Sequence, residues 1–187
     1  MDHSDHVALI RAGVEGAGPN WADLGSGWGA FTLALADVLG PTGRIHSVDR
    51  DAAALRRQRR ELDQRFPAMH VEQLQADFSS PLALMGLDGV VMANSLHFVR
   101  EPAPVIRAVA GMLRPGGHLV LVEYDTDRGN HWVPHPLSFA TWERRAAAAG
   151  LTGTRLLGRR PSSVLAPIYS ALSLNPATGR GTTLPPG

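Results

Sequence analysis

The fold is decided by the stretch Ala22-Asp-Leu-Gly-Ser-Gly-Trp-Gly-Ala30, in which three glycines separate an apolar strand from an apolar helix. We expect the strand over Trp21–Leu24 and the helix over Ala30–Leu39, whose large side chains repeat at helical spacing. A chain that turns sharply within reach of a ligand has no room for a Cβ atom. Asp49 closes the next expected strand, Arg44–Val48, beside this turn. The pattern predicts a nucleoside site in which Asp49 accepts hydrogen bonds from ribose hydroxyls.

Strands and helices alternate along the rest of the chain, which predicts a parallel sheet covered by helices on both faces. Further strands are expected at about Val71–Gln75, Gly89–Ala93, His118–Glu123, Arg155–Leu157 and Val164–Leu174. Further helices are expected at about Asp5–Ala12, Ala52–Phe66, Ala103–Leu113 and Leu137–Ala149. The tail from Asn175 to Gly187 is rich in Pro, Gly and Thr and is expected to be disordered. The sequence therefore predicts one domain over residues 1–174.

The composition excludes several classes of protein. The 187 residues are 44% hydrophobic and 19% charged, which fits one globular domain. The absence of cysteine excludes disulfides, cysteine-based zinc sites and a thiol nucleophile. A formal net charge of +1 and the lack of a long apolar run argue against nucleic acid and membrane partners. The amino-terminal stretch lacks a signal-peptide pattern, so a cytoplasmic location is expected.

The glycine pattern alone leaves the nucleotide open, because Gly25-x-Gly27-x-x-Ala30 also fits a dinucleotide fingerprint. Asp23 precedes the first glycine by two residues, where a pyrophosphate would be repelled and a cationic ligand attracted. Ala76-Asp77-Phe78 follows the third strand and offers a carboxylate and a ring to an adenine. A Leu113-Arg-Pro-Gly-Gly-His-Leu119 turn leads into the fifth strand. Together these features favour a cationic nucleoside.

This ordered set, from Ala22 to Tyr124, resembles the class I S-adenosylmethionine-dependent methyltransferases. The resemblance implies a Rossmann-like three-layer sandwich with a mostly parallel seven-stranded sheet, ordered 3-2-1-4-5-7-6, whose last strand is antiparallel. It implies roles for twelve residues around S-adenosylmethionine. The methionine part would contact Asp23, Gly25, Ser26, Gly27, Trp28 and Gly29, the ribose Asp49, the adenine Arg50, Asp77 and Phe78, and the aminoacyl group Asn94 and Ser95.

Some of these residues have simpler interpretations. Asp49 could be an ordinary strand-end carboxylate, Asp77 a turn former, Arg50 a solvated side chain, and Trp28 a packing residue between helix and sheet. The run Arg56-Arg-Gln-Arg-Arg60 is better explained as a solvated helix face than as a nucleic-acid patch.

Methyl transfer needs a positioned acceptor more than a particular catalytic group, so the catalytic candidates come from loops at the carboxyl ends of strands. His97 follows the fourth strand and is a candidate general base, although it could equally cap or pack under its loop. Tyr124 ends the fifth strand and could line the acceptor pocket. His131 lies in an aromatic loop that could form a lid. His131 and His135 are separated by Pro134, so no metal site is predicted.

The acceptor implied by the resemblance is a small molecule methylated at oxygen, nitrogen or carbon. The alternatives are an RNA or protein methyltransferase, a non-catalytic cofactor-binding relative, and an NAD-dependent oxidoreductase that shares the glycine turn. The Asn/Asp-Pro-Pro-aromatic motif of amino-methylating DNA enzymes is replaced by Asn94-Ser-Leu-His97, and the chain contains no lysine for a Tyr-x-x-x-Lys pair. The pocket must be closed by loops or by a second subunit, so a homodimer is a candidate assembly.

Overall fold

The computed structural model describes residues 1–177, in which helices and strands alternate as expected. The strands are β1 (Asn20–Leu24), β2 (Arg44–Asp49), β3 (His70–Gln75), β4 (Leu87–Ala93), β5 (Leu113–Tyr124), β6 (Thr152–Arg160) and β7 (Ile168–Leu174). The helices are α1 (His3–Val14), α2 (Ala30–Leu39), α3 (Ala52–Arg65), the short 3₁₀ helix η1 (Leu96–Phe98), α4 (Pro102–Met112) and α5 (Phe139–Ala148).

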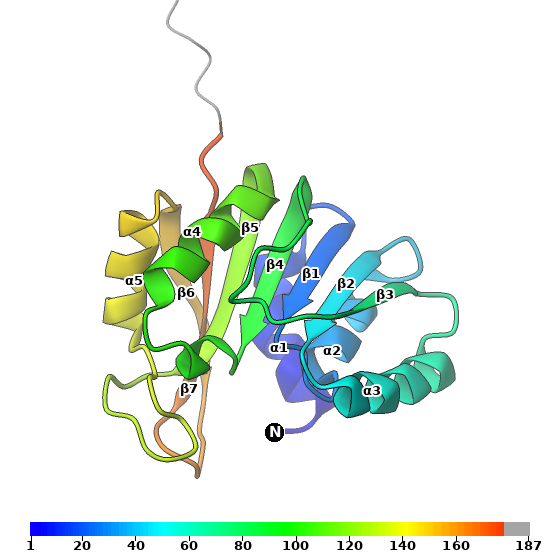
Figure 1. The fold of residues 1–187 in the computed structure, drawn as a ribbon, viewed down its shortest axis with the longest axis horizontal. Helices are drawn as coiled ribbons and strands as arrows, with labels where there is room; N and C mark the ends of the chain where they lie inside the picture. Colours follow the sequence, from blue (N-terminus) through cyan, green and yellow to red (C-terminus); the bar gives the residue numbers. More distant parts are fainter. Residues whose placement is uncertain (178–187) are drawn as a thin grey trace, which may run out of the picture.

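The strands form one sheet in the order β3-β2-β1-β4-β5-β7-β6, which confirms the predicted topology (Figure 1). Strands β1 to β5 pair in parallel, and β7 pairs antiparallel with both β5 and β6. The strand order reverses direction between β1 and β4. In an open parallel sheet this switch point leaves a crevice at the carboxyl ends of the strands, where ligands bind.

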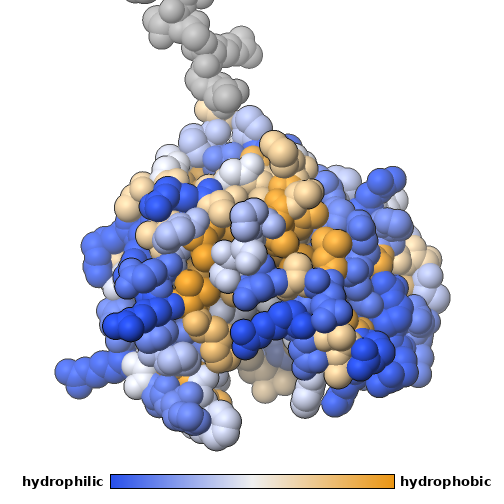
Figure 2. Space-filling model, viewed as in Figure 1, coloured by the Kyte–Doolittle hydropathy of each residue, from blue (hydrophilic) through white to orange (hydrophobic). Residues whose placement is uncertain are grey.

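Two apolar cores fill the spaces between the sheet and its two helical layers. Along β4 successive side chains alternate, so that Val91 and Ala93 pack with α1 and α2, whereas Val90 and Met92 pack with α4 and α5. Burial on both faces explains why the central strands are almost continuously apolar. Figure 2 shows one of the two broad faces, where apolar residues gather in the middle and hydrophilic residues cover both sides.

Several boundaries differ from the sequence expectation. Helix α1 is longer than the predicted Asp5–Ala12, because Asp2 begins it with a capping box. Strand β5 starts at Leu113 rather than His118 and includes the Pro-Gly-Gly segment expected as a break. Leu113 pairs with Leu87 before a register shift, so this segment is an irregularity within the β4–β5 ladder.

The carboxyl-terminal hairpin also differs in extent. Strand β6 is longer than the predicted Arg155–Leu157, and β7 begins at Ile168 rather than Val164. Asn175, the first residue of the predicted tail, donates its side-chain amide to the carbonyl oxygens of Leu113 and Arg114 at 2.9 and 3.2 Å. The rest of that predicted tail, from residue 178 onward, lies outside the described residues.

Candidate active site

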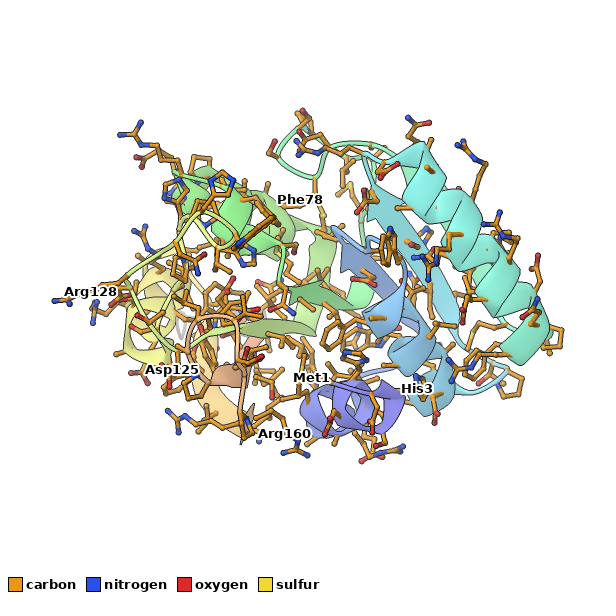
Figure 3. The ribbon with its side chains drawn as sticks, turned by 90° about the horizontal axis from the view of Figure 1, so that it is seen from below. Met1, His3, Phe78, Asp125, Arg128 and Arg160 are labelled. Carbon is orange, nitrogen blue, oxygen red and sulfur yellow. The ribbon has the colours of Figure 1, made fainter. Side chains whose placement is uncertain are left out.

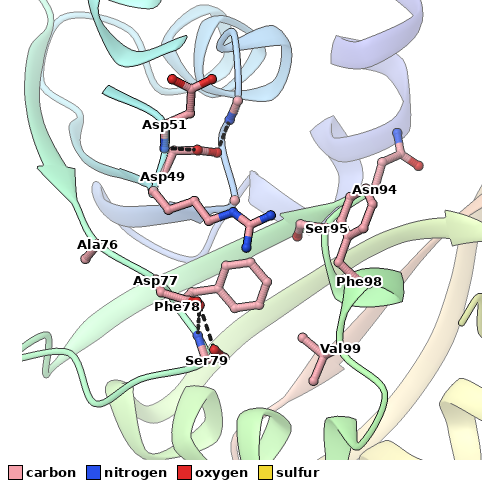
Figure 4. A pocket seen from close by; sticks show the side chains of 13 residues that line it. Asp49, Asp51, Ala76, Asp77, Phe78, Ser79, Asn94, Ser95, Phe98 and Val99 are labelled. Atoms are coloured by element: carbon pink, nitrogen blue, oxygen red, sulfur yellow. Dashed lines mark hydrogen bonds between the residues drawn. The ribbon is translucent and has the colours of Figure 1, made fainter. Parts of the chain in front are cut away.

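A cavity of about 440 Å³ opens at the switch point, at the carboxyl ends of the central strands (Figure 4). Its volume lies within the range of roughly 300–1,000 Å³ typical of small-ligand sites. The lining residues come from the turns that follow β1, β2, β3 and β4, and they are Gly25, Gly27, Asp49, Arg50, Asp51, Ala76, Asp77, Phe78, Ser79, Asn94, Ser95, Phe98 and Val99. Figure 3 shows the molecule from this edge, with Phe78 on one side and Asp125 and Arg128 on the other.

The glycine turn is shaped by backbone conformations and close contacts that favour glycine. Gly25, Gly27 and Gly29 all have positive φ angles, of 78°, 51° and 89°. A Cβ at Gly25 would lie 2.5 Å from the Cβ of Ser95, so the turn after β1 packs directly against the end of β4. A Cβ at Gly27 would meet no protein atom within 4 Å, because this glycine borders the cavity.

Asp49 lines the cavity beside the glycine turn. One carboxylate oxygen accepts a hydrogen bond from the Gly27 N–H at 2.7 Å, and the other accepts one from the Asp51 N–H at 2.8 Å. Each oxygen retains a further lone pair. The carboxylate can therefore hold the glycine turn and still accept hydrogen bonds from two ribose hydroxyls, and its contact with a ribose stays a prediction.

The turn after β3 presents Asp77 and Phe78 to the cavity (Figure 4). The Ser79 hydroxyl and N–H both donate to one oxygen of Asp77, at 2.6 and 2.8 Å. These hydrogen bonds lower the pKa of Asp77, so the carboxyl is ionised at neutral pH. Its second oxygen can accept from an amino group. Asp77 is thus both a turn former and a ready acceptor.

The end of β4 closes the cavity with Asn94 and Ser95. Asn94 is the non-glycine residue with positive φ, 51°, among the described residues. Its buried side-chain oxygen has no hydrogen-bond partner within residues 1–177. An unpaired buried acceptor that borders a cavity suits a ligand that carries N–H donors. This orphaned oxygen and the open space at Gly27 fit an aminoacyl nucleoside such as S-adenosylmethionine.

Four predicted cofactor contacts do not line the cavity: Asp23, Ser26, Trp28 and Gly29. Asp23 and Ser26 are buried behind the glycine turn. The Trp28 side chain is 64% exposed with the Arg57 guanidinium 4.3 Å above its ring, so Trp28 does not pack the helix against the sheet. The other eight predicted contacts line the cavity.

Five lining residues were missed by the sequence reasoning: Asp51, Ala76, Ser79, Phe98 and Val99. Most of them are direct neighbours of predicted residues in the same turns. Phe98 is 62% exposed although it borders the cavity, which no local pattern in the sequence indicates.

The three catalytic candidates lie in different surroundings. His97 and Tyr124 are buried, with ring centroids 6.0 Å apart, and neither is among the residues that line the cavity. His131 is exposed, meets the Trp132 ring edge-on and does not line the cavity. The loop that carries His131 is anchored to the domain, because the His135 N–H donates to the His97 carbonyl oxygen at 3.0 Å and Val133 is buried in the core.

The His97 imidazole is bound to a buried carboxylate. Its Nδ1 lies 2.9 and 3.0 Å from the two oxygens of Glu123, which is fully buried at the end of β5. Glu123 also accepts the Tyr124 N–H at 2.7 Å. Within the described part of the chain no group bonds the His97 Nε2, so this nitrogen is the one left for other chemistry.

The model of a methyltransferase domain family matches residues 22–119, which span the cavity-lining turns and more than half of the chain. The chain belongs to this methyltransferase family. The sheet order and the cavity agree with a class I methyltransferase domain, for which S-adenosylmethionine is the cofactor. This membership sets aside the oxidoreductase alternative.

The chain is similar to known methyltransferases over part of their length. It is 29% identical over 117 residues to the ubiquinone/menaquinone biosynthesis C-methyltransferase UbiE of Hahella chejuensis, which is 62% of this chain and 47% of that protein. The apo structure of the S-adenosylmethionine-dependent methyltransferase SibL superposes with a TM-score of 0.66 at 22% identity, over 84% of this chain and 50% of SibL. The chain spans less than half the length of the curated relatives it matches.

One solved structure matches this chain over nearly its whole length. YcgJ of Bacillus subtilis superposes with a TM-score of 0.74 over 93% of this chain and 99% of YcgJ, at 13% identity. Identity this low supports the fold alone. Among residues 1–177 no helix is long and apolar enough to span a membrane, and no cluster of three metal-ligating side chains is present.

Proposed function

We propose that the protein transfers the methyl group of S-adenosylmethionine to an oxygen, nitrogen or carbon atom of a small molecule. The observation that carries this proposal is the cavity itself, which joins the nucleoside turns at one end to Phe98 and Val99 at the other. An acceptor bound against these apolar side chains would lie beside the aminoacyl end of the cofactor, next to Asn94. The net charge of +1 provides little attraction for a nucleic acid.

S-adenosylmethionine supplies an already activated methyl group. The contribution of the protein is to hold the acceptor about 3 Å from the methyl carbon, in line with the carbon–sulfur bond. In this arrangement the glycine turn, Asp49 and Asp77 bind the nucleoside, while Phe98 and Val99 bind the acceptor and exclude water. When bound, S-adenosylmethionine would supply the methyl carbon and keep the electron pair of the carbon–sulfur bond on sulfur, so positioning by these residues would provide most of the rate.

An acceptor that carries a proton also needs a base, and we assign that role to His97. The Glu123 carboxylate holds the proton on Nδ1, so Nε2 has a free lone pair for the acceptor proton. Glu123 would then stabilise the imidazolium that forms. Tyr124 is a neutral phenol whose pKa is raised by burial, and it would serve as a wall or a hydrogen-bond donor rather than a base.

The exposed His131 and its loop are proposed only as a cover for the acceptor. The relatives named as ubiquinone/menaquinone C-methyltransferases support an aromatic ring as the first class of acceptor to test. A homodimer and a cytoplasmic location remain predictions, and light scattering of the purified protein would decide the first.

The test is turnover of methyl-labelled S-adenosylmethionine with a panel of quinols, phenols and amines. We expect label transfer to at least one small acceptor. His97→Asn should lower that rate by about 10²–10³-fold for a phenol or amine, whereas His135→Asn, a change at an exposed neighbour, should leave it nearly unchanged. Transfer to RNA or protein but to no small acceptor would overturn the proposal.

A further inference from the structure

A chain of buried polar side chains lies beneath the glycine turn, between the sheet and the helices α2 and α3. Its members are Thr32 on α2, Gln58 on α3, Ser47 on β2 and Gln73 on β3, and it ends at Asp23 on β1. Gln58, Thr32 and Ser47 have no exposed surface. Burying so many polar groups in an apolar layer is costly unless each one is paired. The pairing is complete enough to define the direction of each hydrogen bond.

Gln73 fixes one end of this chain. Its amide nitrogen donates to the Leu55 carbonyl oxygen at 2.8 Å and to the side-chain oxygen of Gln58 at 2.6 Å. Its own oxygen accepts from the Arg59 guanidinium at 3.4 Å. A carbonyl can only accept and a guanidinium can only donate, so the amide of Gln73 has one possible orientation.

This orientation determines that of Gln58. Its oxygen accepts from Gln73 and from the Ser47 hydroxyl at 2.8 Å, so its amide nitrogen faces the Thr32 hydroxyl oxygen at 3.0 Å. The Ser47 proton is used on Gln58, so the neighbouring Ser26 hydroxyl, 2.8 Å away, must donate to Ser47. Gln58 thus connects the glycine turn, through Ser26, with the other members.

The Thr32 hydroxyl accepts a hydrogen bond from Gln58 and donates a second hydrogen bond of its own. Its hydroxyl donates to a carboxylate oxygen of Asp23 at 2.6 Å. A helical threonine otherwise tends to donate to the backbone carbonyl one turn earlier. Because Gln58 occupies the acceptor side of the hydroxyl, the proton is directed at Asp23 instead.

We propose that Gln58 is a positioning residue of the cofactor site, which acts through Thr32 to hold Asp23 as a carboxylate behind the glycine turn that receives the cationic end of S-adenosylmethionine. The inference rests on the proposed function, in which that cationic end lies at the glycine turn. Asp23 is buried and does not line the cavity, so its charge acts through the turn at low effective dielectric. Whether Asp23 is ionised in that position depends strongly on the hydrogen bonds that stabilise its carboxylate.

The surroundings of Asp23 make its charge sensitive to one hydrogen bond. Burial raises the pKa of Asp23, the Thr32 hydrogen bonds oppose this, and the nearby Asp49 carboxylate adds to it, so that the pKa is about 7. Its strand neighbours Ser47 on β2 and Val91 on β4 carry no charge, and neither does Gln58 on α3. The ionised fraction of Asp23 should therefore increase as the pH rises through 7, and losing the Thr32 bond should move that rise to higher pH.

The experiment is calorimetric titration of S-adenosylhomocysteine between pH 6 and pH 8 with the wild-type protein, Gln58→Leu and Thr32→Val. If the lost hydrogen bond moves the midpoint of the affinity by about one pH unit, Gln58→Leu should bind about twofold more weakly at pH 8 and about ninefold more weakly at pH 6. Thr32→Val should shift the profile the same way. Thr32→Ser keeps the hydroxyl and should keep the wild-type midpoint.

Gln64→Leu provides a matched control, because Gln64 is exposed on the same helix and lies outside the buried chain. An affinity loss for Gln58→Leu that is equal at all pH values would show a merely structural role and overturn the proposal. An unchanged pH profile in Thr32→Val would overturn it even if Gln58→Leu failed to fold. Absence of binding by the wild-type protein at every pH would instead contradict the cofactor site itself.

Discussion

The carboxyl edge of the sheet has two halves that differ in how their residues are held. The donor half comprises the turns after β1, β2 and β3, where the contacts join residues close in sequence or on adjacent strands, such as Asp77 with Ser79 and Asp49 with Gly27. The acceptor half comprises the segments after β4 and β5 and the β6–β7 turn. There some contacts join segments that are not neighbours in the sheet, such as that between Asp125 after β5 and Arg159 on β6. The difference suggests a fixed nucleoside site beside an acceptor site set by tertiary packing.

The largest effect is expected from a side chain that blocks ligand binding in the donor half without disturbing the fold. Gly27→Val adds a side chain that meets no protein atom near its Cβ but projects where the ligand would lie. We expect S-adenosylhomocysteine affinity to fall by more than about 100-fold, with a stability loss of only about 1–2 kcal/mol from the positive φ. Calorimetry and denaturant unfolding measure the two effects.

Gly40→Val is the matched control for this change. Gly40 also has a positive φ, 65°, and open space around its Cβ, but it caps the far end of α2. Because its ψ is −173°, in a region nearly restricted to glycine, this variant should lose about 1–3 kcal/mol of stability while its affinity stays unchanged. If Gly27→Val bound S-adenosylhomocysteine as tightly as Gly40→Val, the ligand would not bind beside Gly27.

A smaller effect is expected at Asp49. Both of its oxygens accept backbone N–H groups, so Asp49→Asn must turn an amide N–H₂ toward one of those donors. We expect about 30-fold weaker S-adenosylhomocysteine binding, equivalent to about 2 kcal/mol. Asp63→Asn on the exposed face of α3 serves as the control, and equal affinities for the two variants would argue against a ribose contact at Asp49.

Asp23 should make stability depend on pH in an unusual direction. Its pKa of about 7 lies above the ordinary value of 3.8, so between these pH values the folded protein holds a proton that the unfolded chain has lost. The free energy of unfolding therefore decreases as the pH rises from about 4 to about 7. Asp23→Asn removes this decrease, and its stability relative to the wild type should increase by about 1–3 kcal/mol between pH 5 and pH 8. A constant difference in denaturant unfolding would contradict the raised pKa.

In the acceptor half, Phe98→Ala should separate the two sites. Phe98 borders the cavity but is largely exposed, so its removal should lower turnover about tenfold while S-adenosylhomocysteine affinity changes less than about threefold. Met85→Ala, an even more exposed residue in the β3–β4 connection, should change neither quantity. Equal losses of affinity and turnover in Phe98→Ala would mean that the two halves are not independent.

The smallest effect is expected at the Trp28–Arg57 pair on the surface of the glycine turn. A double-mutant cycle of Trp28→Ala and Arg57→Ala should give a coupling of about 0.5–1 kcal/mol in stability, with little change in cofactor affinity. A large loss of cofactor affinity in Trp28→Ala alone would show that this tryptophan contacts the cofactor.

The same contrast explains how much could be predicted from the sequence. The alternation of strands and helices predicted a parallel sheet, and the resemblance to class I methyltransferases implied its strand order. Most of the donor half followed from glycines and strand-end carboxylates, as at Gly27 and Asp49. The burial of Asp23 and the buried pairing of His97 with Glu123 could not be predicted, because they depend on how helices and loops pack over a sheet whose strand order alone does not fix them. Trp28 shows the reverse case, since its place beside the glycines implied a cofactor contact, whereas its side chain is exposed and does not line the cavity.

The central claim is that the cavity between the glycine turn and the end of β4 receives the methyl donor. A crystal structure of the complex with S-adenosylhomocysteine tests it most directly. We predict the ribose hydroxyls on the Asp49 carboxylate, the adenine beside Phe78, and the amino group within hydrogen-bond distance of the Asn94 side-chain oxygen. A ligand bound elsewhere, with that oxygen still unpaired, would contradict the account.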